Sequence, residues 1–282
     1  MEPVNQSLYC AESVRKNDPD RYLLAMMAPS PVRAGLFALY AFNVEVARTR
    51  ELVSEPPLGE IRLQWWRDEI EALYAGGMLR HGISGALRDT VETHELTRAS
   101  FDRLIDARSA DLDDGPPATI ADLLRYSEDT TGPLLTLALE VVGDRSPDAQ
   151  QAARHIGTAW SLAGLVRALP YHLRARRQYL PRELTRSHGV KSRDLLDVKP
   201  SDALNQAVRA LSDIAAGSLR EARSLRSKLG RKGLPVLLQA RFAEMHLQRL
   251  ESVGYNPFDP QLAVPLPMAA WRLTWAKLKG RY

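Results

Sequence analysis

The sequence predicts an all-α fold, built from many helices in a single domain that spans residues 1–282. Apolar residues recur at helical spacing, as Leu36, Leu39 and Val46 do within residues 30–55. No stretch sustains the alternation of apolar and polar residues that a half-buried strand shows. Internal repeats and low-complexity linkers are also missing from the sequence, so no boundary divides the chain.

The helices are expected where periodic apolar segments lie between proline, glycine and polar turns. In chain order these segments are 3–16, 18–28, 30–55, 58–75, 83–95, 97–112, 119–143, 148–173, 201–228, 233–252 and 268–279, with an irregular connector at 181–200. Asp18 or Asp20 suits the N-cap of the second helix. Pro31 suits the first turn of the third helix, and Thr119 with Asp122 predicts a capping box.

The net charge of +4 conceals two halves of opposite charge. Residues 1–150 hold 15 Lys and Arg against 25 Asp and Glu, whereas residues 151–282 hold 23 against 9. The basic half favours an anionic partner, such as a phosphate, an anionic lipid or another protein. The same charges are equally explained by two halves of one domain that face each other.

The sequence also bears on the compartment. Cys10 is the only cysteine, which excludes a disulfide framework and favours a reducing compartment with Cys10 buried. The first residues lack the cationic and apolar regions of a secretory signal. No run reaches the ~20 apolar residues that a membrane-spanning helix needs. We therefore expect a cytoplasmic protein, peripheral at most on the inner face of the cytoplasmic membrane.

Several motifs occur in an order that is typical of one enzyme family. They are Leu39–Phe42 (LYAF), Arg62–Arg67 (RLQWWR), 123–132 (LLRYSEDTTG) and Tyr179–Pro181 (YLP). On these motifs the chain resembles the squalene/phytoene synthases, which act on isoprenyl diphosphates. The resemblance implies the α-helical isoprenoid-synthase fold. It also implies a substrate pocket at Tyr40, Phe42, Asn43, Glu51, Arg167, Tyr171, His172, Arg177 and Tyr179.

The metal-binding motifs of that family are incomplete in this chain. Active members hold Mg²⁺ between aspartates on two facing helices, which neutralises the departing diphosphate. The resemblance places these positions at Ala47, Arg48 and Glu51 in the first helix and at Ala168, Tyr171 and His172 in the second. Only Glu51 is acidic, and Arg48 is suited instead to bind an anion or to pair with a neighbouring glutamate. We expect no metal site and no other cofactor.

One branch of the family shares these replacements. The matching segments here are Ala41–Glu45 (AFNVE), Leu165–His172 (LVRALPYH) and His188–Val190 (HGV). Eukaryotic members of that branch assist the assembly of respiratory complex I. The resemblance therefore implies a non-catalytic assembly factor or chaperone, with complex I subunits or assembly intermediates as partners and an anionic or isoprenoid lipid as a further candidate ligand. The alternative is a prenyl diphosphate transferase with a metal-poor site, which would bring Mg²⁺ back as a cofactor.

Nucleic-acid binding is not expected, because the basic half lacks an aromatic-basic motif. Other polar groups have simpler interpretations. His172 has neither a nucleophile nor a metal partner nearby in sequence, which favours a structural role. The carboxylates of residues 111, 113 and 114 precede Gly115-Pro116-Pro117 and are expected in solvent. The cluster Arg174, Arg176 and Arg177 either binds an anionic headgroup or is solvated.

Two predictions concern aromatic residues. Tyr40, Phe42, Trp65 and Trp66 are expected in the core or the pocket wall, because they lie at helical spacing in the most family-like helices. The terminal segment 268–282 places Trp271, Trp275 and Leu278 on one helical face, with cations elsewhere. It is either an interfacial helix on anionic lipid or a helix that closes the domain.

Overall fold

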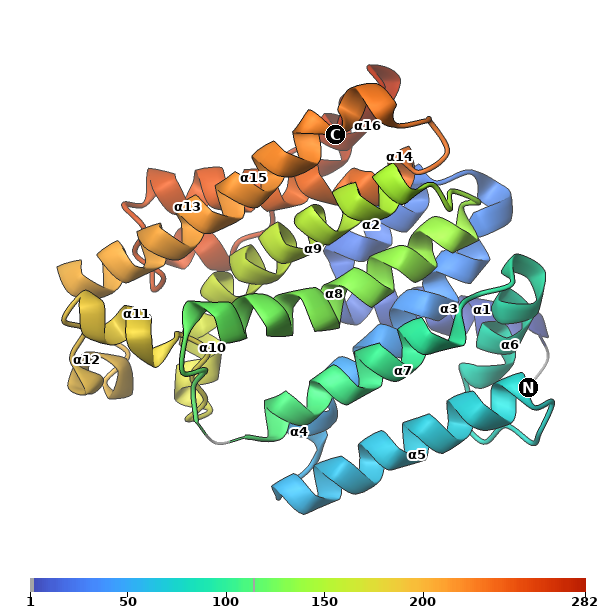
Figure 1. Ribbon diagram of the computed structural model, residues 1–282, viewed down its shortest axis with the longest axis horizontal. Helices are drawn as coiled ribbons and strands as arrows, with labels where there is room; N and C mark the ends of the chain where they lie inside the picture. The colour runs from blue at the N-terminus through green and yellow to red at the C-terminus, as the bar shows by residue number, and fades with distance from the viewer. Residues whose placement is uncertain (1–2, 114) are drawn as a thin grey trace.

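The computed structural model describes residues 3–113 and 115–282, and this part of the chain contains helices and no strand (Figure 1). The helices are α1 (Pro3–Asn17), α2 (Pro19–Met27), α3 (Ser30–Ala47), α4 (Thr49–Leu52), α5 (Pro56–Tyr74), α6 (Ser84–His94), α7 (Arg98–Ala107), η1 (Arg108–Leu112), α8 (Ile120–Val141), α9 (Pro147–Arg167), α10 (Leu169–Arg174), α11 (Arg182–Ser187), α12 (Ser192–Leu196), α13 (Asp202–Ser224), η2 (Arg226–Lys228), α14 (Leu234–Leu237), α15 (Gln239–Ser252), η3 (Pro260–Ala263) and α16 (Ala269–Leu278). The predicted all-α class is confirmed.

Two long helices, α8 and α9, lie side by side in the middle of the molecule (Figure 1). α9 also packs against α13 and α15, while α8 packs against α3 and α7. α3 is covered in turn by α1 and α6. The buried apolar side chains form one continuous cluster, which includes Cys10 as expected. α9 therefore joins the acidic first half of the chain to the basic second half.

The predicted caps are present. Asp18 caps α2, where its Oδ1 accepts a hydrogen bond from the backbone N–H of Arg21 at 3.0 Å. Thr119 and Asp122 form the predicted capping box of α8, in which each side chain accepts from the other's backbone N–H at 3.1 Å. These hydrogen bonds satisfy donors that the first turn of a helix leaves free.

Several long helices that the sequence predicted are broken, and the segment 233–252, for example, divides into α14 and α15 at Leu238. The segment 30–55 divides into α3 and α4 at Arg48, whose φ of −89° and ψ of 5° end α3. The segment 148–173 divides into α9 and α10 at Ala168. Pro170 therefore stands in the first turn of α10, where no backbone donor is needed, and does not kink a helix interior.

The connector at 181–200 was predicted as irregular, and this was wrong. It contains α11 and α12, joined at Gly189, whose φ of +69° suits glycine. Both helices are short and amphipathic, and Leu184 and Leu195 are buried in the common core. Five or six residues give too little periodicity for a helix to be recognised from the sequence.

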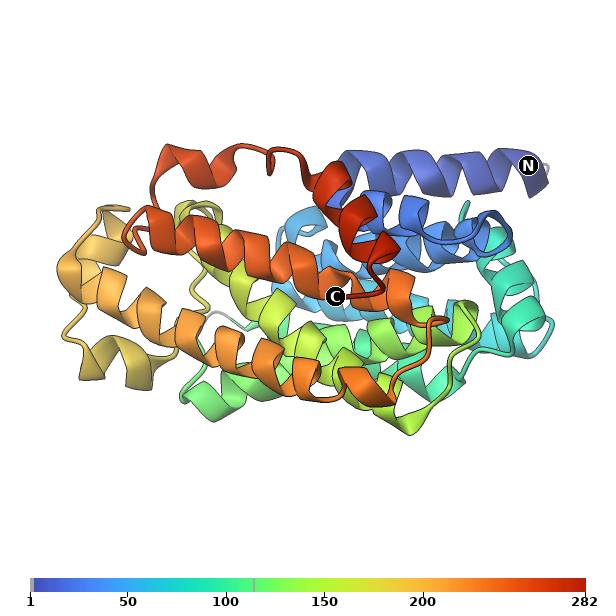
Figure 2. The same cartoon turned by 90° about the horizontal axis from the view of Figure 1, so that it is seen from above.

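The aromatic prediction is confirmed. Trp66 and Phe42 are fully buried, and their rings pack against each other edge-on with 5.3 Å between the two ring centroids. Trp65 is half-buried beside Trp66, and Tyr40 is buried. After α15, the chain crosses back through η3 and ends in α16, which contacts α2 (Figure 2). Among the described residues, no helix is both long and apolar enough to cross a membrane.

Candidate functional site

Two adjoining cavities lie beside α9, where the resemblance places the substrate pocket, and the inner one also borders α3 and α8. The inner cavity has a volume of about 260 Å³ and is lined by Asn43 and Ala47 of α3, Thr131 of α8, and Ser161 and Gly164 of α9, among others. The outer cavity has a volume of about 850 Å³ and extends to the loop before η3. Both cavities are lined in common by Asn17, Asp18, Arg21, Trp160 and Gly164.

The predicted pocket residues are divided among several places. Asn43 and His172 line the inner cavity, together with Ala47 and Arg48. Arg167 and Tyr171 line the outer cavity, together with Ala168. Arg177 and Tyr179 line a third cavity of about 280 Å³. Tyr40 and Phe42 line none of these three cavities and are core residues, while Glu51 lies outside them and pairs with Arg48.

The lining of the inner cavity includes three guanidinium groups. Arg21 is buried, with its Nη1 2.7 Å from Asp18 Oδ2 and its guanidinium 5.4 Å from the ring centroid of Trp160. Arg48 lies 3.4 Å from Glu51 and donates to Asn17 Oδ1 at 3.2 Å. Of the two roles that the sequence left open for Arg48, the pairing with a neighbouring glutamate is the one present.

The third guanidinium, that of Arg108, belongs to a polar cluster around the buried Asp111. Asp111 Oδ1 accepts hydrogen bonds from the hydroxyls of Tyr126 at 2.7 Å and Tyr179 at 2.8 Å. Arg108 Nη1 donates to Asp111 Oδ2 at 3.2 Å, and Arg177 donates to the Tyr179 hydroxyl. Burial and the charge of Asp111 raise the pKa of Tyr126 well above its ordinary value, so this hydroxyl is a neutral donor.

Asp111 corrects the expectation that the carboxylates at 111, 113 and 114 are solvated. Asp111 is buried and Asp113 is exposed, while residue 114 lies outside the described residues. The sequence pointed to a solvent-exposed segment because the adjacent Gly115-Pro116-Pro117 is typical of a surface turn. The sequence signals for this cluster were Arg177, the YLP motif with Tyr179 and the motif at 123–132 with Tyr126, and none of them identified Asp111 as the common partner.

His172 faces the inner cavity in a neutral state. Burial, followed by the charge of Arg177, lowers its pKa to about 4. The centroid of its ring lies 4.6 Å from the ring centroid of Tyr179. The buried Nδ1 of His172 has no hydrogen-bond partner among the described residues. A neutral imidazole without a nucleophile beside it fits the structural role that the sequence favoured.

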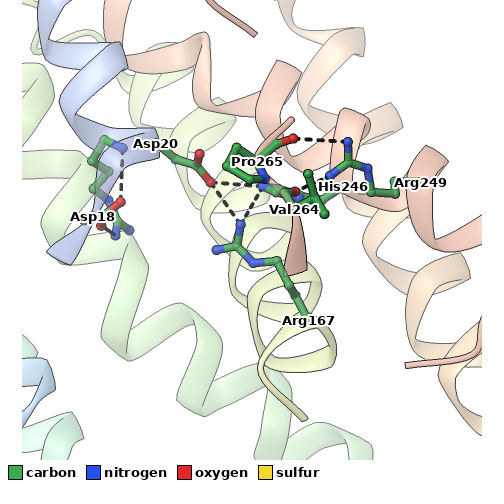
Figure 3. Close-up of polar contacts among 8 residues, drawn as sticks. Asp18, Asp20, Arg167, His246, Arg249, Val264 and Pro265 are labelled. Atoms are coloured by element: carbon green, nitrogen blue, oxygen red, sulfur yellow. Dashed lines mark hydrogen bonds and ion pairs between the residues drawn. The ribbon is translucent and has the colours of Figure 1, made fainter. Parts of the chain in front are cut away.

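Residues far apart in the sequence meet in the wall of the outer cavity (Figure 3). Asp20 Oδ2 lies 3.1 Å from Arg167 Nη1 and 3.0 Å from His246 Nε2. The hydrogen bond with His246 and the charge of Arg167 hold the pKa of Asp20 below its ordinary value, although burial opposes this. Burial lowers the pKa of His246, and the nearby Arg167 adds to that shift. The group is thus an ion pair of Asp20 and Arg167 with a neutral imidazole.

Arg249 anchors the loop that lines one side of this cavity. Its guanidinium donates to the backbone carbonyls of Val264 at 2.5 Å and Pro265 at 3.3 Å (Figure 3). Sequence reasoning did not single out Asp20, His246 or Arg249 as site residues, because their contacts join segments up to 226 positions apart.

The residues of the inner cavity do not fit Mg²⁺. Asp18 is the one carboxylate in its lining, and it is already engaged by Arg21 and by the N-terminus of α2. Arg21, Arg48 and Arg108 line the same space. Mg²⁺ needs several oxygen ligands in octahedral arrangement, including carboxylates, and fixed cations in a partly buried cleft repel it.

Comparisons with known proteins identify the family of the chain. The family model described as squalene/phytoene synthase matches residues 14–278. A bovine protein named NADH dehydrogenase (ubiquinone) complex I, assembly factor 6 is 33% identical over 272 residues, which cover 95% of this chain and 82% of that protein. Presqualene diphosphate synthase from Rhodopseudomonas palustris is 27% identical over 205 residues, which cover 69% of this chain and 71% of that enzyme. The crystal structure of a squalene synthase from Alicyclobacillus acidocaldarius, 22% identical, superposes with a TM-score of 0.79 and covers 90% of this chain and 96% of that structure. The chain belongs to the squalene/phytoene synthase family.

Proposed function

We propose that this protein is a non-catalytic member of its family that assists the assembly of respiratory complex I. The observation that carries the proposal is the charge of the inner cavity, where three arginines stand and the one carboxylate is already paired. The relationship to proteins named as complex I assembly factors supports the choice of partner, namely complex I subunits or assembly intermediates.

The physical argument starts from the leaving group of a prenyl synthase. A departing diphosphate needs neutralisation by Mg²⁺, and the ions need carboxylates from two facing helices. Ala47 of α3 and His172 of α10 now face the inner cavity from the positions of such ligands. A guanidinium at short range costs a bound Mg²⁺ several kcal/mol, even with an effective dielectric constant of about 20.

The alternative is a transferase in which arginines replace the metal. Arg21, Arg48 and Arg108 could in principle contact a diphosphate directly. However, Arg21 is paired with Asp18, Arg48 with Glu51 and Arg108 with Asp111. The carboxylate beside each arginine offsets part of its charge and so weakens the attraction that a diphosphate would find there. Glu45, the other acidic group near the first motif, is itself paired with Arg62 at 2.8 Å.

An activity assay separates the two proposals. Purified protein is incubated with labelled farnesyl or geranylgeranyl diphosphate and Mg²⁺, with an active squalene synthase as the positive control. We expect no condensation product. Squalene, phytoene or their cyclopropyl intermediates at ordinary enzymatic rates would refute the non-catalytic proposal. A separately purified variant should bind Mg²⁺ with an affinity that calorimetry can detect. In this variant aspartate replaces five residues together, namely Ala47, Arg48, Glu51, Ala168 and His172.

A deletion strain tests the partner. Removing the gene from the organism that encodes this protein should lower the amount of assembled complex I on native gels and the rate of NADH:quinone reduction. The wild-type gene should restore both. Intact complex I together with loss of an isoprenoid lipid would favour the transferase instead. Purification in mild detergent should recover complex I subunits or assembly intermediates with the tagged protein.

The location that this proposal requires is the cytoplasm, with access to the inner face of the cytoplasmic membrane, where complex I is assembled. An anionic or isoprenoid lipid remains a candidate ligand of the two adjoining cavities. Apolar residues such as Trp160, Leu262 and Leu266, beside Arg167 and Arg174 in the lining of the outer cavity, support an amphipathic ligand of that kind.

A further inference from the structure

The last helix, α16, exposes a ridge of large apolar side chains. Along this ridge Trp271 is 62% exposed, Trp275 51% and Leu278 69%. Met268, one turn earlier, is 69% exposed. At 3.6 residues per turn Trp271, Trp275 and Leu278 share one face of the helix, and Met268 immediately precedes its first turn. Their exposure means that nothing in the described chain covers that face.

The opposite face of α16 anchors it to the domain. Ala269, Leu273 and Ala276 are buried, and the Thr274 hydroxyl lies 3.9 Å from Met27 Sδ of α2. Ala269, Leu273 and Ala276 lie half a turn away from the ridge. The helix thus closes the domain with one face and presents an apolar face outwards with the other. Of the two alternatives that the sequence left open for this segment, the packing of a closing helix is present, and the interfacial role stays a prediction for the exposed face.

Cations flank the ridge on both sides. Arg272 and Lys279 lie along one flank and Lys277 along the other, as their spacing on the helix requires. The Lys279 ammonium lies 4.7 Å from the ring centroid of Trp275. Residues 260–282 contain no Asp or Glu. The charged residues of α16 beside the apolar ridge are therefore all cations.

A second basic segment lies beside the end of α16. The loop after η2 brings Arg231 against the C-terminal turn, since a Cβ on Gly280 would be 3.7 Å from Arg231 Nη2. Arg231, Lys232 and Lys277 border a cleft of about 350 Å³, whose remaining lining is Pro29, Val32, Val142, Leu234 and Pro235. No ion pair to these three cations is found within residues 3–113 and 115–282.

We propose that the α16 ridge and the cations of this cleft form a docking surface for an anionic lipid bilayer. The occupant follows from the charges and shapes. Tryptophans suit the boundary between headgroups and acyl chains, and an apolar face about 5–10 Å deep is what an interfacial helix buries. The unpaired Arg231, Lys232 and Lys277 lie beside the C-terminal end of α16 and are the groups that we expect to meet lipid phosphates. α16 needs no folding on binding, because its buried face already holds it in place.

The surface gives the protein a way to reach the membrane where its proposed partner is assembled, but it does not depend on that proposal. Binding to protein-free vesicles requires no complex I. A protein that binds vesicles and leaves complex I assembly unchanged would refute the proposed function alone. A protein that supports assembly without binding vesicles would refute this inference alone.

The experiment is flotation of the full-length protein with vesicles of phosphatidylcholine, or of phosphatidylcholine mixed with phosphatidylglycerol. We expect recovery with the anionic vesicles, little with the neutral ones, and loss of binding at high salt. Each cation near an anionic surface strengthens binding by about fivefold. The triple variant Arg231→Gln, Lys232→Gln, Lys277→Gln should therefore bind about 100-fold more weakly.

The ridge variant is Trp271→Ser with Trp275→Ser, and its matched control is Met78→Ser with Leu196→Ser, two exposed apolar residues outside α16. The ridge variant should lose binding while the control keeps it, with far-UV circular dichroism confirming that both variants fold. Equal recovery of ridge variant and wild type would overturn the proposal. So would binding that ignores lipid charge, or a concentration-dependent dimer that the ridge variant abolishes, since the ridge would then be a protein interface.

Discussion

Asp111 is the residue whose environment differs most from its sequence context. Its carboxylate is buried and accepts from two tyrosine hydroxyls while it pairs with Arg108, whose side chain is 13% exposed. Asp111→Asn removes the charge and leaves the guanidinium of Arg108 without its partner. We expect the free energy of unfolding in urea to fall by about 3–5 kcal/mol.

The exposed neighbour provides the control for this prediction. Asp113→Asn changes the same chemistry two residues away, where the side chain is exposed, and should alter stability by less than about 0.5 kcal/mol. Equal effects of the two substitutions would show that the cluster around Asp111 contributes nothing specific.

His172 predicts a dependence of stability on pH. Its pKa is about 4 in the folded protein, below its ordinary value of 6.5, because burial and Arg177 disfavour the charged form. The unfolded chain therefore takes up a proton first as the pH falls. The stabilisation by neutral His172 is complete above about pH 6.5 and is lost as the pH falls towards 4.

The test compares wild type with His172→Gln by urea unfolding at about pH 7 and about pH 4.5, and it uses only the difference between them. His81, His94 and His246 also have lowered pKa values and destabilise both proteins in acid alike. Between these two pH values the free energy of unfolding of the wild type should fall by roughly 1–3 kcal/mol more than that of the variant, a range that allows for the partial exposure of the ring. Parallel losses would contradict the prediction.

Among the elements, the contact between α8 and α9 depends on Gly157. A Cβ at this position would lie 2.9 Å from Thr131 Oγ1 and 3.3 Å from Leu135 Cδ1. Gly164, two turns later on α9, has no such neighbour within 4 Å. Gly164→Ala should stabilise the protein by about 0.5–1 kcal/mol through helix propensity. In Gly157→Ala the clash should cancel that gain or exceed it.

Thermal or urea unfolding of the two alanine variants measures this difference directly, since the substitutions are identical in chemistry and lie in the same helix. A Gly157→Ala variant as stable as Gly164→Ala would mean that Thr131 moves aside without cost, and that α8 and α9 are less tightly packed than the distances indicate.

For helices that carry family motifs, the sequence located some of the side chains that line the cavities and missed the orientation of others. The motifs located α3 and α9, and with them Asn43 and Ala47 on the inner cavity and Arg167 on the outer one. Phe42 comes from the same motif but packs in the core, because neighbouring positions on a helix point to different sides. A family motif identifies a helix more reliably than the direction of each of its side chains.

On the scale of the whole molecule, the two oppositely charged halves meet along α9. Arg167 pairs with Asp20, and Lys228 lies 3.9 Å from Asp148. These contacts support the view that the halves face each other. The cations around α16 and the cleft beside it lie away from such partners, which leaves room for an anionic partner as well.

The shared core predicts that all 282 residues unfold as one unit. Trp65 and Trp66 report on α5, and Trp160 reports on α9, which contacts helices of both halves. Tryptophan fluorescence and far-UV circular dichroism should therefore give the same urea midpoint, as a single cooperative transition does. A fluorescence change that precedes the loss of helix would show that the chain contains two separately folding parts.

The sequence by itself determined the all-α class, the caps of α2 and α8, the family and the replacement of its metal-ligand positions. These properties depend on local patterns, namely apolar periodicity, capping residues and short motifs, which act within a few residues. Only the tertiary structure decided that Asp111 is buried, that Asp20 meets Arg167 and His246, and that the tryptophans of α16 face outwards. Each of these depends on which segments pack together across the core, and burial and pairing over such distances are set by the whole fold and not by neighbouring residues.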